Sequence, residues 1–356
     1  MHIPENYLSP ATCAVMTAAM LPVWTHAVKR VKLDLPKEKI PMVGVGAAFS
    51  FLAMMFNVPL VGGTTGHAVG GALIALLFGP DAACLAVSVA LLLQAVIFGD
   101  GGILAFGANC FNMAFVLPYV GYAASCFLMK ITESTGSADK TKNKNSTARS
   151  CICAAVGAYI GLNTAAFLAA VEFGIQPLLF KDAAGNALYC PYPLSISIPA
   201  MLIPHLAVAG FVEAGFTAAV LAYIRKTAPG FIFEPAASRE MKDGAKTPAP
   251  IFALLAVLIA ATPLGLLAAG TAWGEWGAEE IAETTAGGQA LGYIPKGLAE
   301  GWSLDVVMPD YAMEGMGEIP AYILSAVIGV ALLIIIFKLF SLVGSGKYTE
   351  NSRQRG

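Results

Sequence analysis

The amino-acid sequence predicts an all-α polytopic membrane protein. Of its 356 residues, 57% are hydrophobic and only 12% are charged, and the mean hydropathy is +0.70. Soluble domains carry about a quarter of their residues as charged side chains, which excludes a soluble globular enzyme here. Apolar stretches near the length of a membrane crossing recur along the whole chain. The formal net charge of −2 argues against a nucleic-acid partner, because such a partner requires a basic surface.

Nine apolar stretches are candidate membrane spans: 8–28, 40–57, 68–79, 82–98, 103–129, 151–174, 199–224, 251–270 and 320–343. The third is short, because a helix over 68–79 would cover only about 18 Å. It is either a short helix in a thin or protein-lined place or half of a re-entrant pair. The first residues lack the basic start of a cleavable signal, so we expect the mature chain to begin at Met1.

The basic residues predict the orientation, because Lys and Arg are retained in cytoplasmic loops. Of the 21 basic residues, 19 fall in the segments 29–39, 130–150, 225–250 and 338–356, and only Lys181 and Lys296 fall elsewhere. Nine acidic residues lie between 271 and 319, as expected of an outward-facing loop. Nine spans, with the N-terminus outside and the C-terminus inside, satisfy this pattern, so 68–79 counts as a crossing.

The spans divide into two modules. We expect a seven-span module at 1–228, a polar, proline-containing cytoplasmic linker at 229–249, and a two-span module at 250–345 with the acidic loop outside. No ATP-binding loop is present, since the nearest match, 344–348, lacks the glycine spacing and the hydroxyl residue of a Walker A motif. HExxH and GxSxG motifs are also missing, and the seven cysteines form no CxxC pair. An enzyme is therefore not expected.

The first two residues suggest a metal site. An unmodified Met1 offers its α-amine, and His2 offers its main-chain amide nitrogen and its imidazole. The chosen topology places His67 on the same face, as the natural fourth nitrogen. Four nitrogens in a plane suit Ni(II) or Cu(II), which can also enforce deprotonation of the amide. Zinc, which prefers a tetrahedron, is disfavoured.

Each of these residues also has an ordinary structural interpretation. His67 beside glycines could simply be packed, and Gly62, Gly66 and Gly70 repeat at the four-residue spacing of close-packed membrane helices. His26 is expected near the cytoplasmic end of the first span. Glu213 should face inward, toward a polar partner, a cavity or a coupling protein, because an ionised carboxylate facing lipid is costly. Four polar residues could orient the ligands from a second shell or merely satisfy helix ends: Gln94, Asp100, Asn109 and His205.

Four motifs in order, at residues 1–10, 62–67, 93–102 and 107–113, closely resemble the NikM/CbiM family. The likeness covers about residues 1–225. Members of that family are substrate-capturing S components of energy-coupling-factor transporters for nickel or cobalt. The resemblance implies that the metal is held by the amine of Met1, the amide and imidazole of His2, and His67. Residues 250–345 resemble the small NikN/CbiN component, with a PDGLE-type motif that departs from the usual pattern at 309–314.

The resemblance also implies a setting for the chain. Its partners would be a transmembrane coupling (T) subunit and ABC ATPases in a prokaryotic cytoplasmic membrane, with Ni²⁺, or second Co²⁺, as transported substrate. The competing class is an ion-coupled secondary carrier or channel. That class predicts a series of intramembrane acids and inverted repeats, and the sequence shows Glu172 and Glu213 but no repeat. A receptor would need a folded cytoplasmic output domain, and no segment is long enough.

Overall fold

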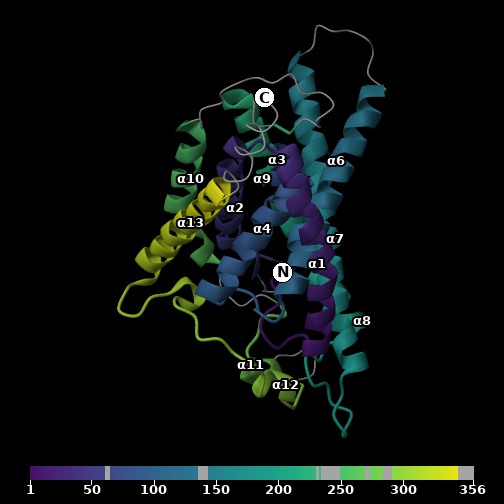
Figure 1. Ribbon diagram of the computed structural model, residues 1–356. Coiled ribbons are helices and arrows are strands. Elements are labelled where there is room, and N and C mark those ends of the chain that lie inside the picture. The colour runs from purple at the N-terminus through teal and green to yellow at the C-terminus, as the bar shows by residue number, and fades with distance from the viewer. Residues whose placement is uncertain are drawn as a thin grey trace, which may run out of the picture.

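The computed structural model describes residues 1–60, 65–134, 143–229, 232–233, 249–268, 273–283 and 291–343. Its α-helices are α1 Pro10–Asp34, α2 Ile40–Met55, α3 Gly71–Phe78, α4 Pro80–Leu93, α5 Phe106–Asn109, α6 Leu117–Ser134, α7 Asn143–Leu179, α8 Leu194–Pro204, α9 Gly210–Thr227, α10 Ala249–Ala261, α11 Ala278–Glu283, α12 Lys296–Ala299 and α13 Glu318–Val343. Two-residue strands β1 Val58–Pro59 and β2 Thr65–Gly66 pair antiparallel. The helices lie side by side as a bundle (Figure 1).

Irregular turns interrupt or extend several helices. π-Helical turns at Gln94–Phe98, Cys110–Val116 and His205–Ala209 continue α4, α5 and α8. Short 3₁₀ turns occupy Lys37–Lys39, Thr262–Leu267 and Pro309–Tyr311. π-Helical turns are often found at functional sites, and each of these three carries or adjoins a polar side chain in the bundle.

Seven helices within the described residues are long and apolar enough to cross a membrane. They begin with α1 and end with α13, and the 16-residue α2 and the eight-residue α3 accompany them. The expectation of an all-α, multi-pass membrane protein is therefore confirmed.

The third expected span is only partly helical. Helix α3 has eight residues, which rise about 12 Å. The non-helical residues 65–70 precede it and could add up to about 20 Å. Their sum is an upper limit, close to the roughly 30 Å hydrocarbon core of a bilayer. Irregular backbone at such a depth requires a protein lining, and all eight residues of α3 are buried.

The interpretation of the repeated glycines as a helix-packing stripe is wrong for two of the three. Gly66 lies in β2, and Gly70 caps the start of α3 with a φ of 72°. That left-handed conformation suits glycine, which has no Cβ. A Cβ on Gly66 would stand 2.6 Å from Leu60. Gly62 lies outside the described residues.

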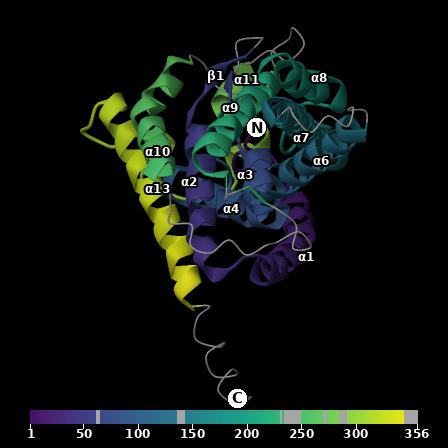
Figure 2. The same ribbon diagram turned by 90° about the horizontal axis from the view of Figure 1, so that it is seen from above.

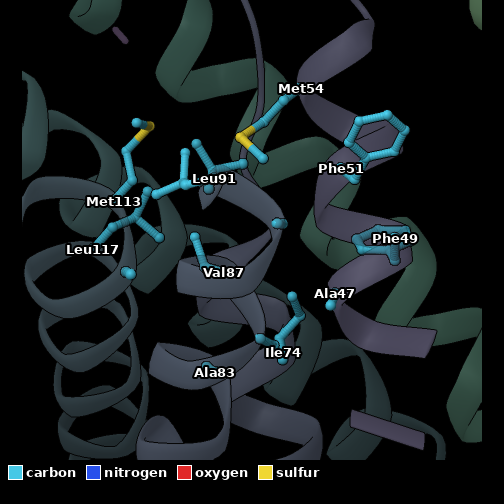
Figure 3. Close-up of a cluster of buried hydrophobic side chains, with 14 of the residues drawn as sticks. Ala47, Phe49, Phe51, Met54, Ile74, Ala83, Val87, Leu91, Met113 and Leu117 are labelled. Atoms are coloured by element: carbon cyan, nitrogen blue, oxygen red, sulfur yellow. The ribbon is translucent and has the colours of Figure 1, made fainter. Parts of the chain in front are cut away.

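Close helix contacts hold the bundle together. A Cβ on Gly157 of α7 would meet the main chain of Gly121 in α6 at 2.5 Å, so only glycine allows this approach. Helix α13 approaches α2 in the same way, because a Cβ on Gly329 would overlap the ring of Phe51. A buried cluster of aliphatic and aromatic side chains between α2, α3, α4 and α6 forms the core (Figure 3).

The two ends of the bundle differ in the elements they carry. The last turns of α1 and α9, which carry Lys32 and Arg225, lie toward the upper end in Figure 1. The short helices α11 and α12 lie at the lower end, and the N-terminus lies among the helices in both views (Figures 1 and 2). The chain turns into α1 at Ser9, whose hydroxyl accepts a hydrogen bond from the Thr12 amide at 3.0 Å.

Candidate metal site

The N-terminal segment enters the bundle and is almost fully buried. Met1 is 4% exposed, His2 is 3% exposed, and Ile3 is completely buried. The side chain of Asn109 holds both main-chain groups of Ile3. Its Oδ1 accepts from Ile3 N at 2.7 Å, and its Nδ2 donates to Ile3 O at 3.0 Å. Asn109 therefore fixes the peptide that follows His2.

Further contacts anchor the segment on either side. The Glu5 carboxylate accepts hydrogen bonds from the amides of Ile103 and Leu104, at 2.5 and 3.2 Å. Burial raises the pKa of this carboxyl, while the two amide bonds oppose that rise. The Ser9 amide donates to Gln176 Oε1 at 3.0 Å. Hydrogen bonds at Ile3, Glu5 and Ser9 thus fix the main chain of the N-terminal segment.

His2 and His67 meet in the interior. His2 Nδ1 lies 3.2 Å from His67 Nε2, and the ring centroids are 4.8 Å apart. His67 Nδ1 lies 3.1 Å from the carbonyl oxygen of Ala68, which can only accept. We assign the proton of His67 to Nδ1 on that ground, which leaves the Nε2 lone pair directed at His2. The two side chains predicted from sequence are therefore in contact.

Asp100 makes the site acidic. Its Oδ1 lies 3.0 Å from His2 Nδ1, and its Oδ2 accepts from Tyr311 OH at 2.5 Å and from Gln94 Nε2 at 3.1 Å. Burial alone would raise the pKa of this carboxyl. The charge of His2 and the hydrogen bonds from His2 and Tyr311 outweigh burial and hold the pKa below its usual range. An ionised Asp100 thus faces the histidine pair.

Two further contacts come from the C-terminal part of the chain. Glu275 Oε1 lies 3.5 Å from the Met1 amine, and Tyr311 binds Asp100 and also accepts from Gln94 Nε2 at 2.9 Å. Asp310 and Tyr311 both adopt positive φ, at 51° and 61°, a costly conformation that is often retained at functional sites. Sequence reasoning missed Glu275 and Tyr311. The signals were the acidic loop and the motif at 309–314.

The remaining candidates from the sequence differ in burial: His205 and Glu213 are buried, whereas His26 is exposed. His205 is buried, and its Nδ1 donates to Met201 O at 2.7 Å. Within the described part of the chain, no hydrogen-bond partner meets His205 Nε2. His26 is 63% exposed and lies beside Asp81, at the start of α4. Glu213 faces inward, as expected, and binds main-chain amides of residues 69 and 70.

Two sequence profiles match the chain. CbiM, described as the cobalt uptake substrate-specific transmembrane region, matches residues 2–231, and the PDGLE domain matches residues 248–345. The chain belongs to the CbiM family. The PDGLE match agrees with the resemblance of residues 250–345 to the NikN/CbiN component.

Relatives of this CbiM-family protein include fused proteins of almost the same length. The probable fused nickel transport protein LarMN of Lactiplantibacillus plantarum is 46% identical, over 95% of this chain and 97% of its own. The fused nickel transport protein NikMN of Rhodobacter capsulatus is also 46% identical, over 94% and 95%. A crystal structure of a truncated transition metal transporter superimposes with a TM-score of 0.57 at 48% identity, over 64% of this chain and 99% of that one.

Proposed function

We propose that this CbiM-family protein captures a divalent transition metal with four nitrogens: the Met1 amine, the His2 amide, His2 Nδ1 and His67 Nε2. The observation that carries the proposal is the 3.2 Å approach of the two imidazole nitrogens. Neighbouring nitrogens in a square plane, with metal–nitrogen bonds of about 2 Å, stand about 2.8 Å apart. The two rings therefore need to approach by only a few tenths of an ångström.

The charge of the surroundings supports the same ion. A divalent cation, a deprotonated His2 amide and an ionised Asp100 sum to zero, which lowers the cost of burying the cation, and Glu275 beside the Met1 amine is partly exposed to solvent. Asp100, positioned by Gln94, compensates the metal, and Asn109 holds the main chain of Ile3, next to the ligand residue His2. His205 is buried, and its Nε2 has no hydrogen-bond partner among the described residues.

Nickel is the favoured substrate, with cobalt second. A planar set of nitrogens that includes a deprotonated amide suits Ni(II), and relatives that align over nearly the whole chain are named as nickel transport proteins. Cobalt remains second because it accepts the same donors and the family description names it.

The role that fits is the S component of an energy-coupling-factor importer in a prokaryotic cytoplasmic membrane. Residues 1–228 would form the capturing module, with the N-terminus outside, joined by 229–249 to the two-span part at 250–345 and an internal C-terminus. A T subunit and ABC ATPases would supply the energy. The buried acids favour this role over a secondary carrier, because Glu213 is bound to amides and Glu172 to Asn112.

Metal competition tests the proposal. Purified protein incubated with equal nickel and cobalt, then freed of unbound ion, is expected to retain about one nickel ion per chain and far less cobalt. Elemental analysis measures both. A chain that retains neither metal contradicts the capture role, and a chain that retains mainly cobalt contradicts the preference.

Replacing Tyr311 with phenylalanine tests the contribution of the C-terminal part. The Tyr311→Phe variant loses the hydroxyl that binds Asp100, so we expect about tenfold weaker nickel binding by calorimetry, as is common when a group behind the ligands is removed. Tyr322→Phe is the matched control, because its hydroxyl binds the Met55 carbonyl at 2.7 Å instead. Equal losses in both variants would argue against a specific role for Tyr311.

A further inference from the structure

Glu213 makes an unusual set of contacts in the middle of the bundle. Its carboxylate, in the first turn of α9, is fully buried. Oε2 accepts from Val69 N at 2.7 Å and from Gly70 N at 3.0 Å, and Oε1 also accepts from Gly70 N at 3.0 Å. The Gly70 amide is thus shared between the two oxygens, and both oxygens lie within hydrogen-bond distance of the main chain.

The position of the two amides explains why a buried carboxylate is tolerated there. Gly70 caps the start of α3, and amides at the start of a helix have no partner within it. The helix dipole also places partial positive charge at that end. Glu213 supplies the acceptors that the amides lack, and the amides stabilise a charge that would be costly alone. These hydrogen bonds connect α9 to the segment that leads into α3.

The same peptide is held from its other side as well. Ser50 of α2 donates its hydroxyl to Val69 O at 2.7 Å, while Glu213 accepts from Val69 N. Val69 is thus fixed through both main-chain groups, two residues after His67. Metal binding requires each ligand to stand within about 0.5 Å of its working position. The placement of residue 69 therefore bears directly on where the His67 imidazole can lie.

We propose that Glu213 is a positioning residue for metal capture, which holds the main chain of Val69 and Gly70 so that His67 Nε2 faces His2. This inference rests on the proposed function, because it takes His67 as a ligand. Glu213 does not touch the metal. It acts through the backbone of the segment that carries the ligand, from an element that is distant in sequence.

Glu172 provides a matched control. Among the described residues it is the other buried glutamate; it lies on α7, and its Oε2 accepts from Asn112 Nδ2 at 2.9 Å. Neutralising it removes a buried acid of the same kind without altering the hydrogen bonds to Val69 and Gly70. Any general effect of replacing a buried glutamate by glutamine should therefore appear in Glu172→Gln as well.

The test is a double-mutant cycle on the full chain, purified in detergent. Nickel affinity is measured by calorimetry for the parent protein, Glu213→Gln, His67→Ala and the double variant. Glutamine directs an amide donor at Gly70 N, so we expect Glu213→Gln to bind about tenfold more weakly. The double variant should bind as His67→Ala does, because a misplaced ligand and a missing ligand are the same loss. Glu172→Gln should change affinity less than about twofold in either background.

A spectroscopic measurement separates positioning from general damage. With Cu(II) as probe, the electron paramagnetic resonance spectrum of Glu213→Gln should show the same loss of one nitrogen ligand as that of His67→Ala. Parent affinity in Glu213→Gln, or an equal further loss in the double variant, overturns the inference. If His67→Ala itself binds like the parent, the proposed ligand set is refuted, which is a different result.

A variant that fails to fold does not end the test. If Glu213→Gln does not accumulate in membranes, Glu213→Asp keeps the charge but withdraws the carboxylate by one methylene. It should weaken nickel binding in the parent and leave the affinity of His67→Ala unchanged. A loss of equal size in both backgrounds would show that Glu213 acts on the fold and not through His67.

Discussion

A chain with one additional residue before Met1 will lose nickel binding almost completely, by more than about a hundredfold. The added peptide bond converts the Met1 amine into an amide and moves the terminal amine away from His2. The chelate ring from amine to amide then loses its first donor, and only the ring from the His2 amide to the His2 imidazole keeps both donors. The segment also has no room to shift, because Met1 and His2 are buried and Asn109 holds Ile3. Calorimetry with nickel measures the loss.

The control for this prediction restores the original terminus. The same extension, built with a protease site that leaves Met1 first after cleavage, should bind nickel like the parent once it is cut. Insertion into the membrane should be the same before and after cleavage, since none of the spans is altered. The extended terminus itself offers an amine, two amide nitrogens and the His2 imidazole, so an extended chain is also compared with its His67→Ala variant. Parent affinity in the extended chain that still depends on His67 would show that the Met1 amine is not a required ligand.

The membrane fold follows from composition and apolar length, but the conformation of the segment 68–79 does not. The sequence placed 68–79 correctly as an apolar stretch, and an apolar run does not reveal whether protein or lipid surrounds it. Here protein surrounds it, and non-helical residues 65–70 take the place of helical turns. Glycines at four-residue spacing suggested helix packing, whereas Gly70 provides a left-handed cap. The same spacing serves both purposes, so only the tertiary structure distinguishes them.

The candidate site was accessible to sequence reasoning only in part. Met1, His2 and His67 emerged from chelate chemistry combined with topology, and the structure brings the two imidazoles together. Asp100 was among the candidates, but its partner Tyr311 lies 211 residues further along the chain. No periodicity or spacing rule connects residues at such a separation. Glu275 was recognised only as one acid of an acidic loop, because the loop gives no indication of which carboxylate turns inward.

Replacing His67 with alanine will weaken nickel binding at least tenfold, or about 1.4 kcal/mol, without abolishing it. The remaining three nitrogens belong to one short peptide and still chelate the ion, which is why the loss should be smaller than that caused by the extension. Ligand-field absorption should shift as one nitrogen leaves the plane. His26→Ala is the control, because His26 is exposed beside Asp81 and should leave the isotherm unchanged. An unaltered isotherm for His67→Ala would show that another donor holds the fourth position. His205 is the candidate imidazole, because its Nε2 has no hydrogen-bond partner among the described residues.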